Sequence, residues 1–199
     1  MTNRATSQIR SVCLYCGAKA GSDPAWAAAA EALGRGLAER GMELVYGGGR
    51  VGLMGIAADA ALRAGGKVTG IIPHFLRKAE VGHGAVSRLI LVDTMHERKQ
   101  RMSEIADAFV VLPGGLGTLD EMFEIVTWKQ LGLHDKSIVI ADIAGFWQPL
   151  RDLLDHIVRT ELMHGELGDF LRFAPDIERV FALLETAPAP RSPLKSEQI

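Results

Sequence analysis

Short apolar runs alternate with helical segments along the chain, and this alternation constrains the fold more than any other feature of the sequence. Such alternation is typical of a parallel β-sheet covered by helices. Strands are expected at residues 11–15, 42–46, 67–72, 88–92, 109–112 and 137–141, with a weaker one at 171–173. Helices are expected at residues 24–39, 53–64, 94–106, 118–131, 146–162 and 175–184. The sequence therefore predicts an α/β fold with a central parallel sheet between two helical layers.

The chain has the length of one domain with a substantial core. Its 199 residues show no sign of a second globular unit. We expect residues 11–186 to form a single domain. Residues 1–10 are polar and are expected to be a flexible N-terminus. Residues 187–199 are rich in proline and polar side chains, and they are expected to be a disordered tail.

Charge and hydropathy exclude several classes of protein. No run approaches the roughly 18 consecutive apolar residues that a membrane span needs, and residues 1–10 lack the apolar core of a signal peptide. We therefore expect a cytoplasmic protein that does not act at a membrane. The 22 basic and 24 acidic residues give a net charge of −2, and the aromatic residues are scattered, so no nucleic-acid partner is expected.

Cys13 and Cys16 form a C-x-x-C pattern, which in other settings indicates a redox pair or half of a zinc site. Here the pattern overlaps an expected strand, on which residues three apart point to opposite faces. The sequence has no further cysteine to complete a metal site. We therefore expect two reduced, packed thiols.

The first glycine-rich turn follows the second expected strand, and its Gly47, Gly49 and Gly52 match a G-x-G-x-x-G spacing. A dinucleotide site would have this turn after the first strand and an acidic residue about 20 positions later, which the next strand does not supply. A tight strand-to-helix turn is the simplest alternative, but it does not require so many glycines. We interpret Gly47, Gly48 and Gly49 as part of a ligand surface lined by backbone.

The second glycine-rich turn, Leu112–Glu121, follows the fifth expected strand and leads into an amphipathic helix. Glycines let backbone N–H groups approach an anion, and a helix start adds unpaired donors and a partial positive charge. The turn therefore resembles a phosphate cradle, although no G-K-[ST] sequence makes it a Walker A loop. Thr118 is expected to cap the helix and to offer its hydroxyl to a phosphate. Thr118 and Glu121 also match a capping box, which is a structural alternative for Glu121.

Arg98 falls on the apolar stripe that Met95, Met102 and Ile105 define on the fourth expected helix. A guanidinium that points inward needs an anionic or carbonyl partner. Three interpretations are open: Arg98 extends outward over apolar surface, it forms a structural salt bridge, or it faces one ligand together with Glu121.

The histidines show no metal-ligand spacing. His74, His83, His96 and His134 are spread over a long loop and separate strand ends, where solvated or packed side chains are the better interpretation. We therefore expect no metal site.

Three motifs carry a resemblance to a known family. The turn Gly47–Gly55, the run Met95–Lys99 and the run Pro113–Glu121 resemble the LONELY GUY (LOG) family of cytokinin riboside 5′-monophosphate phosphoribohydrolases, formerly labelled lysine decarboxylase-like. The similarity extends from about Ser11 to Leu184. It implies a Rossmann-like fold, a homodimer and a nucleotide-binding catalytic domain over residues 11–186. It also implies that no cofactor is needed to hydrolyse N6-modified adenosine 5′-monophosphates, often AMP as well, to free base and ribose 5-phosphate.

The resemblance also implies roles for individual residues. Arg98 and Glu121 match the catalytic pair, and Glu80 corresponds by its spacing from Pro73 to an acidic substrate contact. The predicted substrate-binding residues are Gly47, Gly48, Gly49, Glu80, Arg98, Lys99, Gly114, Gly115, Leu116, Gly117, Thr118, Leu119, Asp120 and Thr127. Family members often read Cys-Gly-Ser-Ser after the first strand. Here Ala18 and Lys19 replace the serines, so a hydroxyl contact is lost or is replaced by Lys19.

Cleavage of an N-glycosidic bond builds positive charge on the ribose, so a nearby carboxylate stabilises the transition state and orients or deprotonates water. Glu121 suits that role, while Arg98 fixes the substrate, keeps Glu121 ionised or helps the base to depart.

Three alternative functions compete with this one: a nucleotide-sensing module without turnover, a pyridoxal-phosphate decarboxylase and a dehydrogenase. The decarboxylase needs a Schiff-base lysine, and the sequence marks none.

Overall fold

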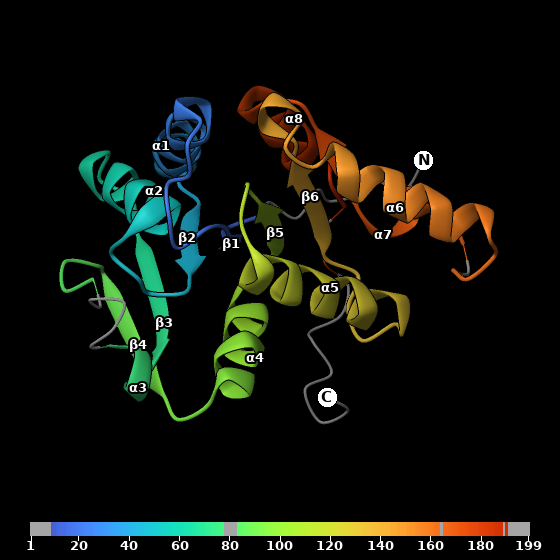
Figure 1. Ribbon diagram of the computed structural model, residues 1–199. Helices are drawn as coiled ribbons and strands as arrows, with labels where there is room; N and C mark the ends of the chain where they lie inside the picture. Colours follow the sequence, from blue (N-terminus) through green and yellow to red (C-terminus); the bar gives the residue numbers. More distant parts are fainter. Residues whose placement is uncertain (1–8, 78–82, 164, 189, 191–199) are drawn as a thin grey trace, which may run out of the picture.

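The computed structural model describes residues 9–77, 83–163, 165–188 and 190. Within this part of the chain, seven parallel strands form one sheet in the order β4-β3-β2-β1-β5-β6-β7 (Figure 1). The strands are β1 Ser11–Tyr15, β2 Glu43–Tyr46, β3 Val68–Pro73, β4 Arg88–Val92, β5 Ala108–Val111, β6 Ser137–Ala141 and β7 Arg172–Ala174. The helices are α1 Pro24–Glu39, α2 Gly52–Arg63, α3 His74–Arg77, α4 Met95–Ile105, α5 Leu116–Gln130, α6 Gln148–Arg159, α7 Leu167–Phe170 and α8 Ile177–Glu185, with a 3₁₀ turn η1 at Ile143–Gly145.

The predicted fold class is confirmed, with every predicted strand and helix present. The structure adds α3 and α7, each of four residues, and the turn η1. One turn of helix is too short to show the apolar periodicity by which sequence patterns identify helices. The other differences are at the ends of strands and helices, of which the start of α5 matters for the site.

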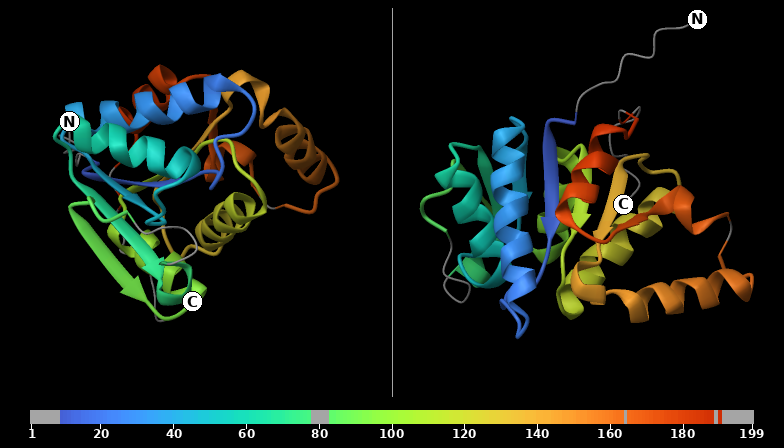
Figure 2. Two further views of the ribbon diagram at one scale, coloured as in Figure 1. Left: turned by 60° about the vertical axis from the view of Figure 1, so that its left-hand side comes forward. Right: turned by 90° about the horizontal axis from the view of Figure 1, so that it is seen from above.

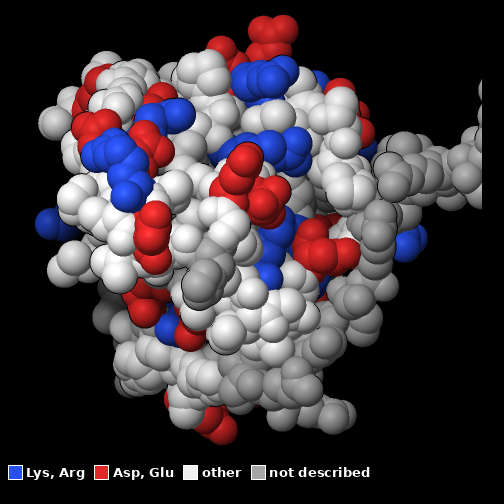
Figure 3. Space-filling view, turned by 90° about the vertical axis from the view of Figure 1, so that its right-hand side faces the viewer, with Lys and Arg blue, Asp and Glu red and all other residues white. Residues whose placement is uncertain are grey.

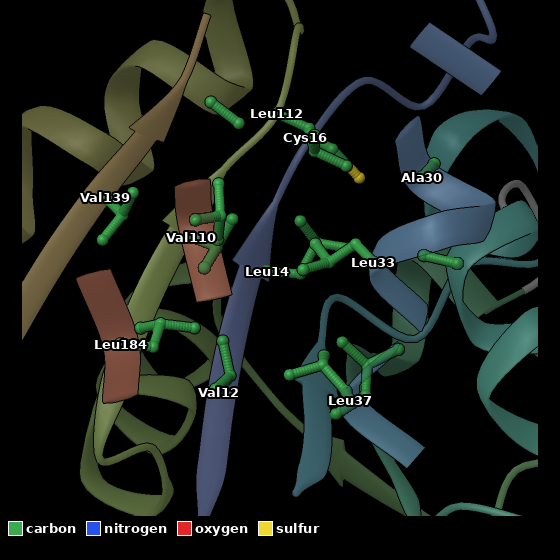
Figure 4. Close-up of a cluster of buried hydrophobic side chains, with 14 of the residues drawn as sticks. Val12, Leu14, Cys16, Ala30, Leu33, Leu37, Val110, Leu112, Val139 and Leu184 are labelled. Carbon is green, nitrogen blue, oxygen red and sulfur yellow. The ribbon is translucent and has the colours of Figure 1, made fainter. Parts of the chain in front are cut away.

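The side chains of the strands alternate between two hydrophobic clusters, one on each face of the sheet. On one face the strands pack against α1, α2 and α8, and on the other against α4, α5 and α6. Figure 2 shows α1 and α2 side by side on their face. In Figure 4, Val12 and Leu14 of β1 lie in the same cluster as Leu33 and Leu37 of α1. These are the two helical layers that the sequence predicts.

The two cysteines lie in different clusters, as predicted. Cys13 packs on the α4 and α5 face, and Cys16 packs on the α1 and α2 face. Both are free thiols and both are buried. Burial raises the pKa of both thiols, so they remain protonated and unreactive.

The segments predicted to flank the domain, residues 1–10 and 187–199, fall largely outside the described residues, which begin at residue 9 and include only 187, 188 and 190 of the predicted tail. Ile9 and Ala187 are both buried against the core. In the described part of the chain, no helix is both long and apolar enough to cross a bilayer.

The strand order has a switch point at β1. From β1 the chain builds outward through β2, β3 and β4, and it then returns to add β5, β6 and β7 on the other side of β1. The loop after β1 leads to α1 on one face, and the loop after β5 leads to α5 on the other. Such a divergence opens a crevice at the carboxyl ends of the strands, where open α/β sheets bind ligands.

Candidate active site

A pocket of about 300 Å³ lies at this switch point. Five parts of the chain line it: the loop after β1, α2, α3, the first turns of α4, and the start of α5. The lining residues are Cys16, Gly17, Ala18, Met54, Leu76, Met95, Arg98, Gly115, Gly117, Thr118, Asp120 and Glu121. The fold therefore brings the predicted Arg98, Glu121 and second glycine-rich turn into one cavity.

Arg98 is buried, and its guanidinium is held by two backbone carbonyl groups, one directly after β2 and one within β3. Nε donates to the Ile71 carbonyl at 3.2 Å and Nη2 donates to the Gly47 carbonyl at 2.9 Å. Nη1 lies 4.0 Å from Oε1 of Glu121. The inward direction expected from the apolar stripe is confirmed, and the alternative in which Arg98 extends outward over the surface is wrong.

Gly47 makes this arrangement possible because it has no side chain. A Cβ at residue 47 would overlap Nη2 of Arg98. Gly48 has a φ of +76°, which favours glycine, and its carbonyl accepts the N–H of His83. Glycines 47–49 are buried and are not among the described residues that line the pocket. In this structure the first glycine-rich turn supports Arg98 from behind and does not form the pocket wall that the sequence predicts.

The start of α5 presents unpaired backbone donors to the pocket. The helix begins at Leu116, with Gly115 as its N-cap and no side-chain cap. Because the first bond of the helix runs from the Leu119 N–H to the Gly115 carbonyl, the N–H groups of residues 116–118 have no partner within the helix. Unpaired N–H groups at a helix start, together with the helix dipole, are suited to binding an anion.

The predicted cap at Thr118 and the predicted capping box with Glu121 are wrong. The helix starts two residues earlier than predicted, so Thr118 is a buried residue of its first turn. A Cβ at Gly114 would overlap the Thr118 side chain, so this glycine leaves room for Thr118 to pack. Glu121 is thereby released from a capping role and lines the pocket.

Lys99, which follows Arg98 on α4, forms ion pairs with two carboxylates of α5. Its Nζ lies 3.1 Å from Oδ2 of Asp120 and 3.0 Å from Oε1 of Glu124. Burial opposes the charged form, but the hydrogen bonds to Glu124 and Asp120 outweigh it and raise the pKa of Lys99. Glu124 was missed in the sequence, although it lies three residues after Glu121 and so on a neighbouring part of the same helix face. Lys99 is therefore a fixed ammonium paired with carboxylates.

His134 and Lys136 form a brace between α4 and α5: His134 bonds to α5, and Lys136 bonds to α4. His134 donates from Nε2 to the Ile125 carbonyl of α5 at 2.8 Å, and its Nδ1 accepts the Lys136 N–H at 3.2 Å. Lys136 donates from Nζ to the Ser103 carbonyl near the end of α4. The same short segment thus ties the two helices that carry Arg98 and Glu121. A buried lysine bound to a helix end has no periodic signature, so the sequence did not indicate it.

The loop after β1 closes the remaining wall. The Gly17 N–H donates to the Pro113 carbonyl at 3.0 Å, and the Gly17 carbonyl accepts the Leu53 N–H at 3.1 Å. Cys16 lines the pocket, but burial, and then the charge of Glu121, raise the pKa of its thiol well above the usual value. This thiol is therefore not a nucleophile at neutral pH.

Other predicted site residues lie elsewhere. Leu116 is exposed and Leu119 is partly buried, and neither lines the pocket. Lys99 and Gly114 border it without being among its lining residues, and Thr127 is exposed farther along α5. Glu80 lies outside the described residues. Lys19 lines an adjoining pocket on the other side of the loop after β1.

The surface charges on one side of the molecule and the distribution of metal-binding side chains can be compared with the predictions. On the side of the molecule that carries α6, basic and acidic side chains are interspersed, without a broad area of one sign (Figure 3). In the described ranges no three His, Cys, Asp or Glu side chains gather in a group that could hold a metal ion.

Known proteins resemble this chain over most of its length. A family model described as a possible lysine decarboxylase matches residues 54–184. Over 178 residues the chain is 45% identical to a cytokinin riboside 5′-monophosphate phosphoribohydrolase of Rhodococcoides fascians, covering 89% of this chain and 90% of that protein. It is 40% identical to the enzyme of that name, LOG, from Oryza sativa subsp. japonica, covering 90% of this chain and 74% of that protein.

A solved structure shows a similar fold. The molybdenum cofactor carrier protein of Chlamydomonas reinhardtii superposes with a TM-score of 0.69 at 21% identity, covering 89% of this chain and 97% of that one. At this level of identity the similarity concerns the fold alone.

The brace generates a prediction about pH. Burial, and then the charge of Lys136, lower the pKa of His134 to about 4. Because this value lies below that of an unfolded histidine, the stabilisation by His134 is complete above about pH 6.5 and is lost as the pH falls toward 4. We expect His134→Gln, which keeps an N–H donor but does not titrate, to remove roughly 3 kcal/mol of the decrease in unfolding free energy between pH 7 and 4.

Denaturant unfolding at both pH values measures this difference. The exposed His156 of α6 supplies the control, since His156→Gln should leave the decrease unchanged. An equal decrease in wild-type protein and in His134→Gln would contradict the assignment.

Proposed function

Because this chain belongs to the LOG family of cytokinin riboside 5′-monophosphate phosphoribohydrolases, we propose that it hydrolyses the bond between base and ribose in N6-modified adenosine 5′-monophosphates. The products are the free base and ribose 5-phosphate. One observation carries the proposal: Arg98 and Glu121 line the same pocket as the uncapped start of α5. An anion-binding helix start and a carboxylate are the two groups that this reaction requires.

The 5′-phosphate binds at the start of α5. The N–H groups of residues 116–118 donate to its oxygens, and the Thr118 hydroxyl lies beside them. Glu121 follows Thr118 by three residues on the same helix, a rise of about 4.5 Å. A ribose ring separates the 5′-phosphate from C1′, so this spacing supports a Glu121 that faces the glycosidic carbon and not the phosphate.

Glu121 acts on the sugar. As the base departs, positive charge develops on the ribose, and the carboxylate stabilises it and orients the attacking water. Arg98 lies 4.0 Å from Glu121, which favours the ionised carboxylate. Since Nε and Nη2 of Arg98 donate to backbone carbonyls, the guanidinium is fixed before substrate binds. Preorganised charge of this kind needs no rearrangement during the reaction.

Met54, Leu76 and Met95 supply the apolar part of the pocket, and we propose that the purine base packs against them. Methionine side chains adapt to flat ring surfaces. Plain AMP satisfies the same phosphate and ribose contacts, so we propose it as a substrate as well.

The label of the family model suggests a second candidate, a lysine decarboxylase. A pyridoxal-phosphate enzyme needs a lysine that can lose its proton and form a Schiff base. In the described part of the chain, the pocket lining includes no lysine, and the nearby Lys99 is paired with Asp120 and Glu124, which raise its pKa. These side chains do not fit that chemistry.

The expected homodimer is a proposal that one surface supports. Leu116, Phe123, Thr127 and Leu131 share one face of α5 and are exposed. An exposed apolar stripe on a helix is typical of an interface, and a second copy of the chain would cover Thr127 there.

We expect sedimentation equilibrium to give a dimer mass for the wild type and a monomer mass for Phe123→Glu, whereas a monomeric wild type would contradict this proposal. The cytoplasmic location and the absence of a cofactor also stay predictions.

The main prediction concerns the proposed catalytic pair. We expect Glu121→Gln and Arg98→Ala each to abolish base release, a decrease of at least about 10²-fold, because the first loses the carboxylate charge and the second the cation beside it. Chromatography of products after incubation with AMP and with N6-benzyl-AMP measures this. Circular dichroism checks that each variant folds.

The same assay separates hydrolysis from sensing. Free base and ribose 5-phosphate in wild-type reactions support the enzyme, whereas bound but intact nucleotide supports a sensing module. Base release that persists in either variant would contradict the assignment of the pair.

A further prediction concerns Gly47. We expect Gly47→Ala to displace the guanidinium of Arg98, since the new Cβ would overlap Nη2. A displacement of this size near the reacting atoms lowers kcat by about 10²-fold, while KM changes little because Gly47 does not line the pocket. Gly168→Ala is the matched control, because a Cβ at residue 168 meets open space. An unchanged kcat for Gly47→Ala would contradict the supporting role of this turn.

A further inference from the structure

A second pocket, of about 320 Å³, adjoins the first at the switch point. The two pockets share Gly17, Ala18 and Gly115, so only the loop after β1 and the start of α5 separate them. The second pocket opens toward α1 and the segment after β6, and none of the steps of the proposed reaction uses it. Its volume lies at the lower end of the range for small-molecule sites, about 300–1,000 Å³.

Two aromatic rings form a corner of this second pocket. Trp26 of α1 and Phe146 pack edge to face, with ring centroids 5.1 Å apart and an interplanar angle of 77°. Phe146 is held in turn by Trp147, at 4.7 Å and 86°. Gly21, with a φ of +79°, lies directly over the Trp26 ring, where a Cβ would overlap it. Two rings at a right angle suit the face and the edge of a flat aromatic ligand.

The charges around the two pockets differ. Asp120 and Glu121 line the first pocket, whereas the described residues of the second include no carboxylate. Lys19 is the charged residue among them, and its side chain is exposed. An ammonium at the mouth of an aromatic pocket adds a cation–π contact for a planar ring. Lys19, like Ala18, stands where family members often have a serine.

The indole of Trp26 has an unused donor. Its Nε1 is shielded from solvent and has no hydrogen-bond partner among the described residues. A shielded N–H without a partner is destabilising. Because it is shielded, the indole must tilt outward before it can donate to a ligand, and a ring nitrogen acceptor in the pocket recovers that bond. This requirement favours a heteroaromatic ligand over a purely aliphatic one.

We infer that the second pocket binds the free purine base, the planar heteroaromatic product of the proposed reaction. The inference deepens the proposed function, and it rests on that function for the identity of the base. The two pockets share the wall at Gly17 and Ala18, so the aromatic corner lies next to the pocket in which the base is released. A base in the second pocket does not compete with nucleotide in the first, so both bind to one chain at the same time.

The test measures binding with the first pocket occupied. Calorimetric titration of N6-benzyladenine into Glu121→Gln loaded with saturating AMP reports the second pocket alone. We expect one base per chain, with affinity reduced at least about fivefold by Trp26→Phe, which removes the N–H and part of the ring area, and abolished by Ala20→Phe, which fills the pocket. Trp128→Phe is the matched control, because Trp128 is a buried indole of α5 that lines neither pocket.

Two results would overturn the inference: no binding of base to the loaded protein, or binding that Trp26→Phe and Ala20→Phe leave unchanged. Failure of the proposed function is distinguishable, because it shows as nucleotide left intact by the wild type, whatever base binding the titration gives.

Discussion

The burial of one guanidinium organises the site. A charged side chain inside a protein is stable only where hydrogen-bond acceptors replace its water, and Arg98 obtains them from the Gly47 and Ile71 carbonyls. β2 ends at Tyr46, opposite Gly70, whereas β3 continues to Pro73, so the Ile71 carbonyl lies beyond the last pair with β2. The Gly47 carbonyl is accessible because residue 47 has no side chain. Arg98 is thereby fixed 4.0 Å from Glu121, on a helix that the brace of His134 and Lys136 ties to α5.

The parallel topology then holds the backbone N–H groups at the start of α5 and the guanidinium of Arg98 on different sides of β1. The chain diverges after β1 and β5, so the start of α5 meets the crevice with unpaired N–H groups, while the strand ends on the other side of β1 hold Arg98. In the proposed function the phosphate takes the helix start and Glu121 faces the ribose one turn along. The backbone binds the anion, and the side chains act on the glycosidic bond.

The sequence predicted the layers and strands because apolar periodicity reflects burial directly. It also predicted that Arg98 points inward, since a charge at a core position has few alternatives. It did not predict the start of α5, where Thr118 and Glu121 match a capping pattern that local sequence cannot tell from a pocket wall. The roles of Gly47, His134 and Lys136 were also missed, because they depend on contacts between elements that are distant in the chain. The contact predicted for Thr127 stays untested, and Glu80 lies outside the described residues.

The most direct test of this account is a crystal structure of Glu121→Gln with N6-benzyl-AMP bound. The account predicts phosphate oxygens within hydrogen-bond distance of the N–H groups of residues 116–118 and C1′ facing the side chain at 121, with Arg98 still on the Gly47 and Ile71 carbonyls. A phosphate bound elsewhere, or a glycosidic bond turned away from residue 121, would contradict it.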